Sequence, residues 1–164
     1  DWIRSVLGNP RSVHCKSIKH PGVPKLSDAR SSIILDYEKD IRCCLSINHT
    51  HDTDIHGMKH SHAYARVEGL KGAAYIKFGL LLNYPKGEPE EIEISTDGVE
   101  WTKVNNVGTW FPDAFIGTMS SLQRFASGEE KELLHSVDNA YETMALVYAC
   151  LKSNESLGTP VEYN

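Results

Sequence analysis

The residues from His62 to Leu82 constrain the fold most, because they alternate in character on both sides of a glycine-containing turn. The alternating residues before the turn are Ala63, Tyr64, Ala65, Arg66, Val67 and Glu68, and those after it are Ala74, Tyr75, Ile76, Lys77 and Phe78. A period of two is typical of β-strands. A loop of four or five residues with glycine, here Glu68 to Gly72, is a normal hairpin closure. We therefore predict a β-hairpin over this stretch.

Strand patterns also occur before and after this hairpin. The further strands that we predict are Ser12 to Ile18, Ser32 to Tyr37, Arg42 to Thr50, Glu91 to Ser95 and Glu100 to Val104. Short connections such as Glu38 to Asp40 favour pairing between strands that follow one another. Together with the hairpin, these segments predict about seven strands that are mostly antiparallel.

Helical spacing appears at both ends of the chain. Residues 2 to 10 end in Gly8 and Pro10, which is how a helix stops. Pro112 to Ser127 predicts an amphipathic helix that ends at Gly128. A further helix begins at Ser136 and ends near Gly158. Its apolar stripe consists of Ala140, Met144, Val147, Tyr148 and Leu151.

Strands followed by helices, without strict alternation, favour an α+β fold. We predict an open, mostly antiparallel β-sheet with helices packed on one face. The chain of 164 residues has the size of a single domain, so we expect residues 1–164 to form one. No apolar run approaches the length of a membrane span.

Charge and cysteine content exclude several classes of protein. The net charge is −5 and no run of lysines or arginines occurs, so we expect no nucleic-acid partner and no membrane surface as partner. Four cysteines at irregular spacing are too few for a disulfide scaffold. Reduced, structural thiols are the favoured interpretation, and we expect a cytoplasmic protein.

Five histidines gather within fourteen residues: His49, His51, His56, His60 and His62, together with Asp52 and Asp54. Imidazole and carboxylate groups suit Zn²⁺ or Fe²⁺, so a metal site is one interpretation. A polar rim of a cleft or subunit contact is the favoured one, and an indifferent surface is the third. Trp110 could line a pocket or belong to the core. Neither Gly-x-Ser-x-Gly, nor Gly-x-Gly-x-x-Gly, nor a P-loop occurs, so the residues alone indicate no reaction.

Four stretches carry a resemblance to a known family: Trp2 to Val13, Val67 to Ala73, Asp113 to Gly128 and Ser136 to Val161. In their order and spacing, these stretches resemble the C-terminal domain of the Gfo/Idh/MocA oxidoreductases. The second stretch, for example, is similar to the Glu-Gly-Thr-x-Gly hairpin of that family. Together the four cover nearly the whole chain.

The resemblance implies a substrate-binding and oligomerisation domain of an NAD(P)-dependent dehydrogenase for a sugar, cyclitol or similar polyol. It implies a Rossmann domain, absent from this chain, that binds NAD or NADP, so the fragment itself binds no cofactor and is inactive alone. It also implies self-association through the open sheet face. The catalytic His and Lys are expected upstream of Asp1, and none is expected within this fragment.

The resemblance also gives the histidines a role. It places Asn48, His49 and His51 at a strand end that can face the substrate cleft, where imidazole pairs well with hydroxyl groups. With Trp110, these residues form our predicted substrate-binding set, and no metal ligands are assigned. The alternative function is a non-enzymatic carbohydrate- or protein-binding module with a His-rich rim.

Overall fold

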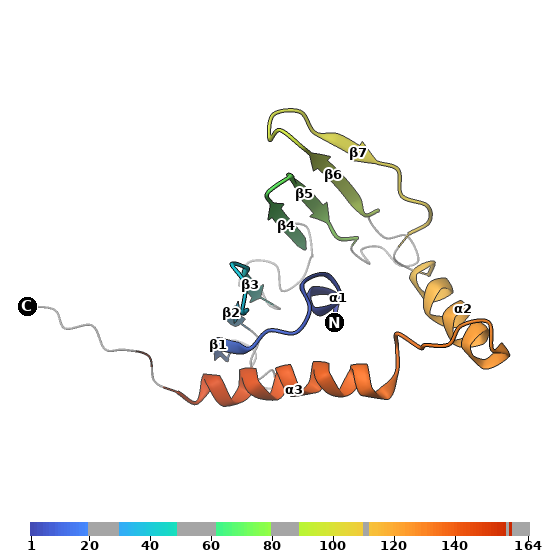
Figure 1. The fold of residues 1–164 in the computed structure, drawn as a ribbon. Helices are drawn as coiled ribbons and strands as arrows, with labels where there is room; N and C mark the ends of the chain where they lie inside the picture. Colours follow the sequence, from blue (N-terminus) through green and yellow to red (C-terminus); the bar gives the residue numbers. More distant parts are fainter. Residues whose placement is uncertain (20–29, 49–61, 80–88, 110–111, 157, 159–164) are drawn as a thin grey trace, which may run out of the picture. The chain divides into compact units, whose positions relative to one another are not determined.

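The computed structural model describes residues 1–19, 30–48, 62–79, 89–109, 112–156 and 158. Within them the order of elements is α1 (Trp2–Leu7), β1 (Ser12–Ile18), β2 (Arg30–Asp36), β3 (Arg42–Asn48), β4 (Tyr64–Gly69), β5 (Gly72–Lys77), β6 (Glu91–Ser95), β7 (Thr102–Val104), α2 (Ala114–Ser127) and α3 (Val137–Asn154) (Figure 1). The chain divides into two compact units, Asp1–Ile55 with His135–Asn164, and His56–Leu134. Each unit is described by itself.

The first unit contains an antiparallel sheet in the order β1-β2-β3, with α3 packed against β1. Cys15 of β1 lies opposite Ile33 of β2, and Ile33 lies opposite Leu45 of β3, so these three side chains share one face. Cys15 and Leu35, which lie on that face, are buried. The buried residues of this sheet therefore lie on one face, and α3 packs along its β1 edge.

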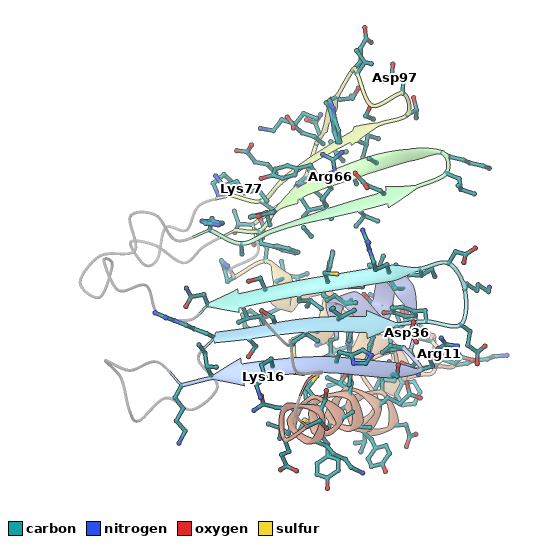
Figure 2. The ribbon with its side chains drawn as sticks, turned by 90° about the vertical axis from the view of Figure 1, so that its left-hand side faces the viewer. Arg11, Lys16, Asp36, Arg66, Lys77 and Asp97 are labelled. Carbon is teal, nitrogen blue, oxygen red and sulfur yellow. The ribbon has the colours of Figure 1, made fainter. Side chains whose placement is uncertain are left out.

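The second unit contains an antiparallel sheet in the order β4-β5-β6-β7, together with α2. Its register separates two faces. The apolar face carries Ala65, Val67, Ala74, Ile76, Ile92 and Ile94. The polar face carries Tyr64, Arg66, Tyr75, Lys77, Glu91 and Glu93, and Figure 2 shows Arg66 and Lys77 on it. The strict alternation in the sequence produces this separation.

The predicted α+β class and the antiparallel pairing are confirmed. The described residues form seven strands, as expected, which the structure distributes over two sheets. The central hairpin has a tighter turn than we predicted, because Gly69 pairs with Gly72 and leaves Leu70 and Lys71 as the loop.

Most predicted helix ends agree with the structure, but α3 ends at Asn154, four residues before the predicted end near Gly158. Gly8, with φ of 78°, follows α1, and Gly128, with φ of 82°, follows α2 in the left-handed conformation. The Ser136 side chain accepts a hydrogen bond from the Asn139 N–H at 3.2 Å and so caps α3. Among the described residues, no helix has the length and apolar character that crossing a membrane requires.

The apolar stripe of α3 lies on the exposed side of that helix. Met144 is 61% exposed and Tyr148 is 70% exposed. The side that meets β1 carries Ser153, whose hydroxyl accepts a hydrogen bond from the Cys15 N–H. The helix therefore packs on the sheet through a side with smaller and more polar residues than its stripe.

Candidate functional site

The structure describes one of the four predicted substrate-binding residues. Asn48 is the last residue of β3 and is exposed. His49, His51 and Trp110 lie outside the described residues. The same holds for His56 and His60.

Asn48 lies opposite Arg30 of β2, and Arg30 lies opposite Ile18 of β1. Because directly opposed residues of antiparallel strands point to the same side, Asn48 and Arg30 share one face at one end of the sheet. We call this pair the polar corner. An amide offers donors and an acceptor, and a guanidinium offers five donors in a planar fork. Such a pair can bind hydroxyl or carboxylate groups.

Arg30 is the member of the polar corner that we did not predict from the sequence. It follows a stretch that contains Pro21, Gly22 and Pro24, and our predicted strand began two residues later, at Ser32. Arg30 is identified by its pairing with Asn48 between β2 and β3, and the sequence alone does not show this pairing.

No metal centre is visible in the described part of the chain, where no group of three or more His, Cys, Asp or Glu side chains gathers. The described member of the histidine cluster, His62, stacks on Tyr64 with ring centroids 5.5 Å apart. Tyr64 stacks in turn on Tyr75 at 6.0 Å. These rings form an aromatic row on the polar face of the second sheet.

A second polar cluster surrounds the start of the chain. Arg4 is buried, and its Nη1 donates hydrogen bonds to Thr143 Oγ1 at 2.6 Å and to the Asn139 carbonyl oxygen at 3.1 Å. Its Nη2 donates to the Glu142 carboxylate. The Thr143 hydroxyl donates to the Asp1 carboxylate. This network fixes α1 and Asp1 to α3.

The perturbed pKa values do not point to an activated nucleophile. Burial raises the pKa of the Cys43 and Cys150 thiols, which reduces the thiolate fraction that a nucleophile needs. A hydrogen bond from Arg11 lowers the pKa of the Asp36 carboxyl, and Figure 2 shows this pair at the end of β1 and β2. These shifts have structural causes.

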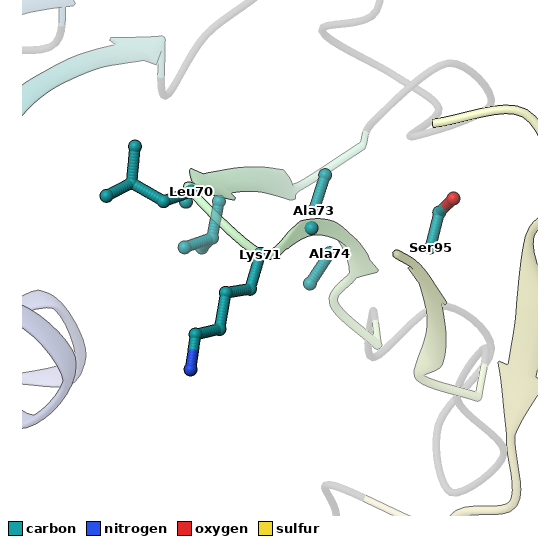
Figure 3. A pocket seen from close by; sticks show the side chains of 8 residues that line it. Leu70, Lys71, Ala73, Ala74 and Ser95 are labelled. Carbon is teal, nitrogen blue, oxygen red and sulfur yellow. The ribbon is translucent and has the colours of Figure 1, made fainter. Parts of the chain in front are cut away.

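A shallow depression lies beside the turn of the central hairpin (Figure 3). It is lined by Val67, Gly69, Leu70, Lys71, Gly72, Ala73, Ala74 and Ser95. This lining is mostly apolar, with Lys71 as its charged member. It offers neither an acid–base pair nor a set of convergent polar groups, so we do not assign a function to it.

Comparisons with known proteins give a likeness of fold. No family model matches this sequence. The search of curated proteins found no match either. A solved structure that matches is an oxidoreductase from Agrobacterium radiobacter in complex with NAD+, L-tartaric acid and magnesium. Its TM-score is 0.66 at 15% sequence identity, over 93% of this chain and 43% of that chain.

The likeness shows that this chain has the fold of part of an oxidoreductase. The chain spans less than half the length of that protein. At such low identity, the comparison concerns the arrangement of helices and strands.

Proposed function

We propose that this chain is the substrate-binding and oligomerisation domain of an NAD(P)-dependent dehydrogenase of the Gfo/Idh/MocA type. The observation that carries the proposal is the match in fold over 93% of the chain to 43% of an oxidoreductase. The order of the four sequence stretches described above supports it independently.

The described residues do not fit a dinucleotide site of the Rossmann type. Such a site needs parallel strands joined by a helix and a glycine-rich turn that receives the phosphates. The described strands pair antiparallel, and the sequence contains no Gly-x-Gly-x-x-Gly. In the proposal a separate domain holds NAD or NADP, and its nicotinamide carries the hydride. This chain binds and orients the substrate.

The proposed substrate is a sugar, cyclitol or similar polyol. Asn48 of the polar corner is followed in the sequence by His49 and His51, so residues with hydrogen-bond donors and acceptors are concentrated in this stretch of the sequence. Hydroxyl groups of a polyol need both. L-Tartaric acid, which the matching oxidoreductase contains, carries hydroxyl groups on two adjacent carbons and supports this substrate class.

The polar face of the second sheet is our proposed surface for self-association in the parent enzyme. Tyr64 is 59% exposed and Tyr75 is 37% exposed on this face. Aromatic residues and Arg are enriched at protein interfaces, and this face carries Arg66 opposite Tyr75.

Ligand-observed NMR on the purified chain tests the substrate proposal. We expect binding of one or more members of a panel of sugars and cyclitols, weakened at least about fivefold by Asn48→Ala, by Arg30→Gln and by His49→Ala. His14→Ala is the matched control, because His14 is exposed on β1 away from the polar corner.

Titration with NAD+ and NADP+ tests the assignment of the cofactor to another domain. We expect no binding of either by this chain. Specific binding of a dinucleotide here would contradict the proposal. The non-enzymatic binding module would be favoured instead if the complete gene product bound a saccharide but showed no dehydrogenase activity with either NAD+ or NADP+.

A further inference from the structure

The exposed side of α3 carries a continuous row of large apolar side chains. The row consists of Val137, Tyr141, Met144, Tyr148 and Leu151, and we call it the outer stripe. Their exposed fractions range from 49% for Leu151 to 84% for Val137. Water disfavours such a continuous apolar surface, so a partner is expected to cover it.

The outer stripe faces away from the sheet of its own unit. The opposite side of α3 is occupied, because Thr143 binds Arg4 and Ser153 binds the N–H of Cys15. Successive helical residues are turned by about 100°, which places the stripe on the far side of the helix from these contacts. The partner therefore approaches without displacing β1.

The spacing along the stripe is that of a helix-to-helix seam. Its residues follow one another at intervals of four, three, four and three, the repeat that brings two α-helices together along their length. Ala140 and Ala145 lie beside this seam, and their small side chains allow a close approach of the two helices.

The charges at the two ends of the seam are self-complementary. Asp138 lies in the first turn of α3 and Lys152 in the last turn, both exposed and in equivalent positions beside the stripe. When two copies of α3 run antiparallel and are centred near Met144, Asp138 of each copy lies opposite Lys152 of the other. Tyr141 then lies opposite Tyr148, so both the charges and the apolar residues match.

We propose that the outer stripe docks a second copy of this chain, with the two α3 helices antiparallel. In a two-fold symmetric interface both subunits use the same surface, so each contact occurs twice. A second copy therefore matches the Asp138 and Lys152 charges at both ends of the seam. The proposal does not depend on the dehydrogenase function, and it uses a different surface from the polar face of the second sheet.

Sedimentation equilibrium tests the surface. We expect the mass of the chain to rise from 18.3 kDa toward twice that value as concentration increases. Tyr148→Glu should weaken this association at least about tenfold in the otherwise unchanged chain. The same loss is expected in a chain that also carries Tyr64→Glu, which disables the polar face of the second sheet. Val99→Glu, at an isolated exposed valine in the turn between β6 and β7, is the matched control and should leave the association unchanged.

A charge exchange tests the antiparallel register. Asp138→Lys and Lys152→Asp should each weaken association about threefold, and the two combined should restore it. Asp138 and Lys152 also stabilise α3 itself, because they complement the helix dipole at its two ends, and the combined variant loses this stabilisation. Circular dichroism measures the helix content of each variant and so separates a loss of helix from a loss of association.

Any of three results would overturn the proposal. The first is a monomer at every concentration, and the second is an association that Tyr148→Glu leaves intact. The third is a combined charge variant that associates no better than the two single variants, which would exclude the antiparallel register.

Discussion

Arg4 is a buried cation whose partners come from several segments of the first unit. Its side chain is 7% exposed, and it binds Asn9 Oδ1 at 2.7 Å as well as Asn139, Glu142 and Thr143 of α3. A buried guanidinium is tolerated when hydrogen bonds occupy its donors, as they do here. The pair of Arg4 and Glu142 thus joins α1 to α3.

Replacement of Arg4 should strongly destabilise the first unit. We expect Arg4→Met to lower the free energy of unfolding by about 3 kcal/mol, because Asn139 and Thr143 lose a shared donor in a buried site. Urea denaturation measures this change. Arg11→Met is the control: Arg11 is 58% exposed beside Asp36 and should matter little. Equal effects of the two substitutions would contradict this account.

Gly72 is a position that the tertiary structure restricts to glycine. Its φ is 148°, and a Cβ atom placed there would lie 2.3 Å from the Ser95 backbone oxygen. Figure 3 shows Ser95 on the strand next to the hairpin. The neighbouring backbone cannot give way as a flexible side chain can.

Gly72→Ala should therefore destabilise the protein by about 2 kcal/mol. Gly117→Ala is the matched control, because Gly117 lies inside α2 with nothing within 4 Å of the added Cβ. That control should stabilise the helix by about 0.5 to 1 kcal/mol. Urea denaturation of both variants gives the comparison, and a loss at Gly117 as large as at Gly72 would count against the steric argument.

At the scale of single elements, α3 closes the free edge of β1. The Cys15 N–H donates to Ser153 Oγ at 2.9 Å, and the Ser17 N–H donates to Asn154 Oδ1 at 2.8 Å. An uncovered strand edge invites pairing with another chain, and a helix laid along it prevents this. The last turn of α3 thus substitutes for a neighbouring strand.

Asn154→Ala should remove the partner of the Ser17 N–H. We expect faster amide hydrogen exchange at Ser17 and a loss of about 1 to 2 kcal/mol in stability, because a partly buried donor is left without its acceptor. Glu155→Ala, at the next residue along the chain, is the control and should leave exchange at Ser17 unchanged. Unaltered exchange in Asn154→Ala would show that the contact contributes nothing.

Asp97 organises the turn between β6 and β7, at the tip labelled in Figure 2. Its carboxylate accepts hydrogen bonds from the Val99 N–H at 2.9 Å, the Glu100 N–H at 2.9 Å and the Ser95 hydroxyl at 3.0 Å. These bonds, the Val99 N–H first, lower the pKa of Asp97 below its ordinary value of 3.8. The folded state therefore favours the charged carboxylate.

The direction of this pKa shift predicts how stability depends on pH. A carboxyl whose pKa is lower in the folded state stabilises the protein above its unfolded pKa, and the benefit disappears as pH falls through the folded pKa. In Asp97→Asn the free energy of unfolding should therefore decrease less steeply as the pH falls below about 4. Urea denaturation between pH 2 and pH 6 measures it, and an unchanged slope would contradict the role of Asp97.

At the scale of the whole molecule, the chain consists of two compact units, and the second lies within the sequence of the first. The single-domain organisation that we predicted implies one cooperative unfolding transition. We expect Arg4→Met in the first unit and Gly72→Ala in the second to displace the same calorimetric transition. Two transitions, each shifted by one of these variants, would show that the units unfold independently.

Much of the local structure could be predicted because it depends on neighbouring residues. Alternation around Gly72 predicted the hairpin, and Ser136 and Gly128 predicted helix ends through their own capping chemistry. The candidate site was predicted less completely. The family resemblance placed Asn48 in the predicted substrate-binding set, whereas Arg30 joins it only through cross-strand register.

The sequence by itself determined the α+β class, the antiparallel strands and most of the helix ends, because periodicity and capping act over a few residues. Only the tertiary structure decided which strands share a sheet, that Arg4 binds α3, and that the apolar stripe of α3 faces outward. These features depend on contacts between residues far apart in the chain, and a helical stripe has the same spacing whether it meets its own sheet or another partner.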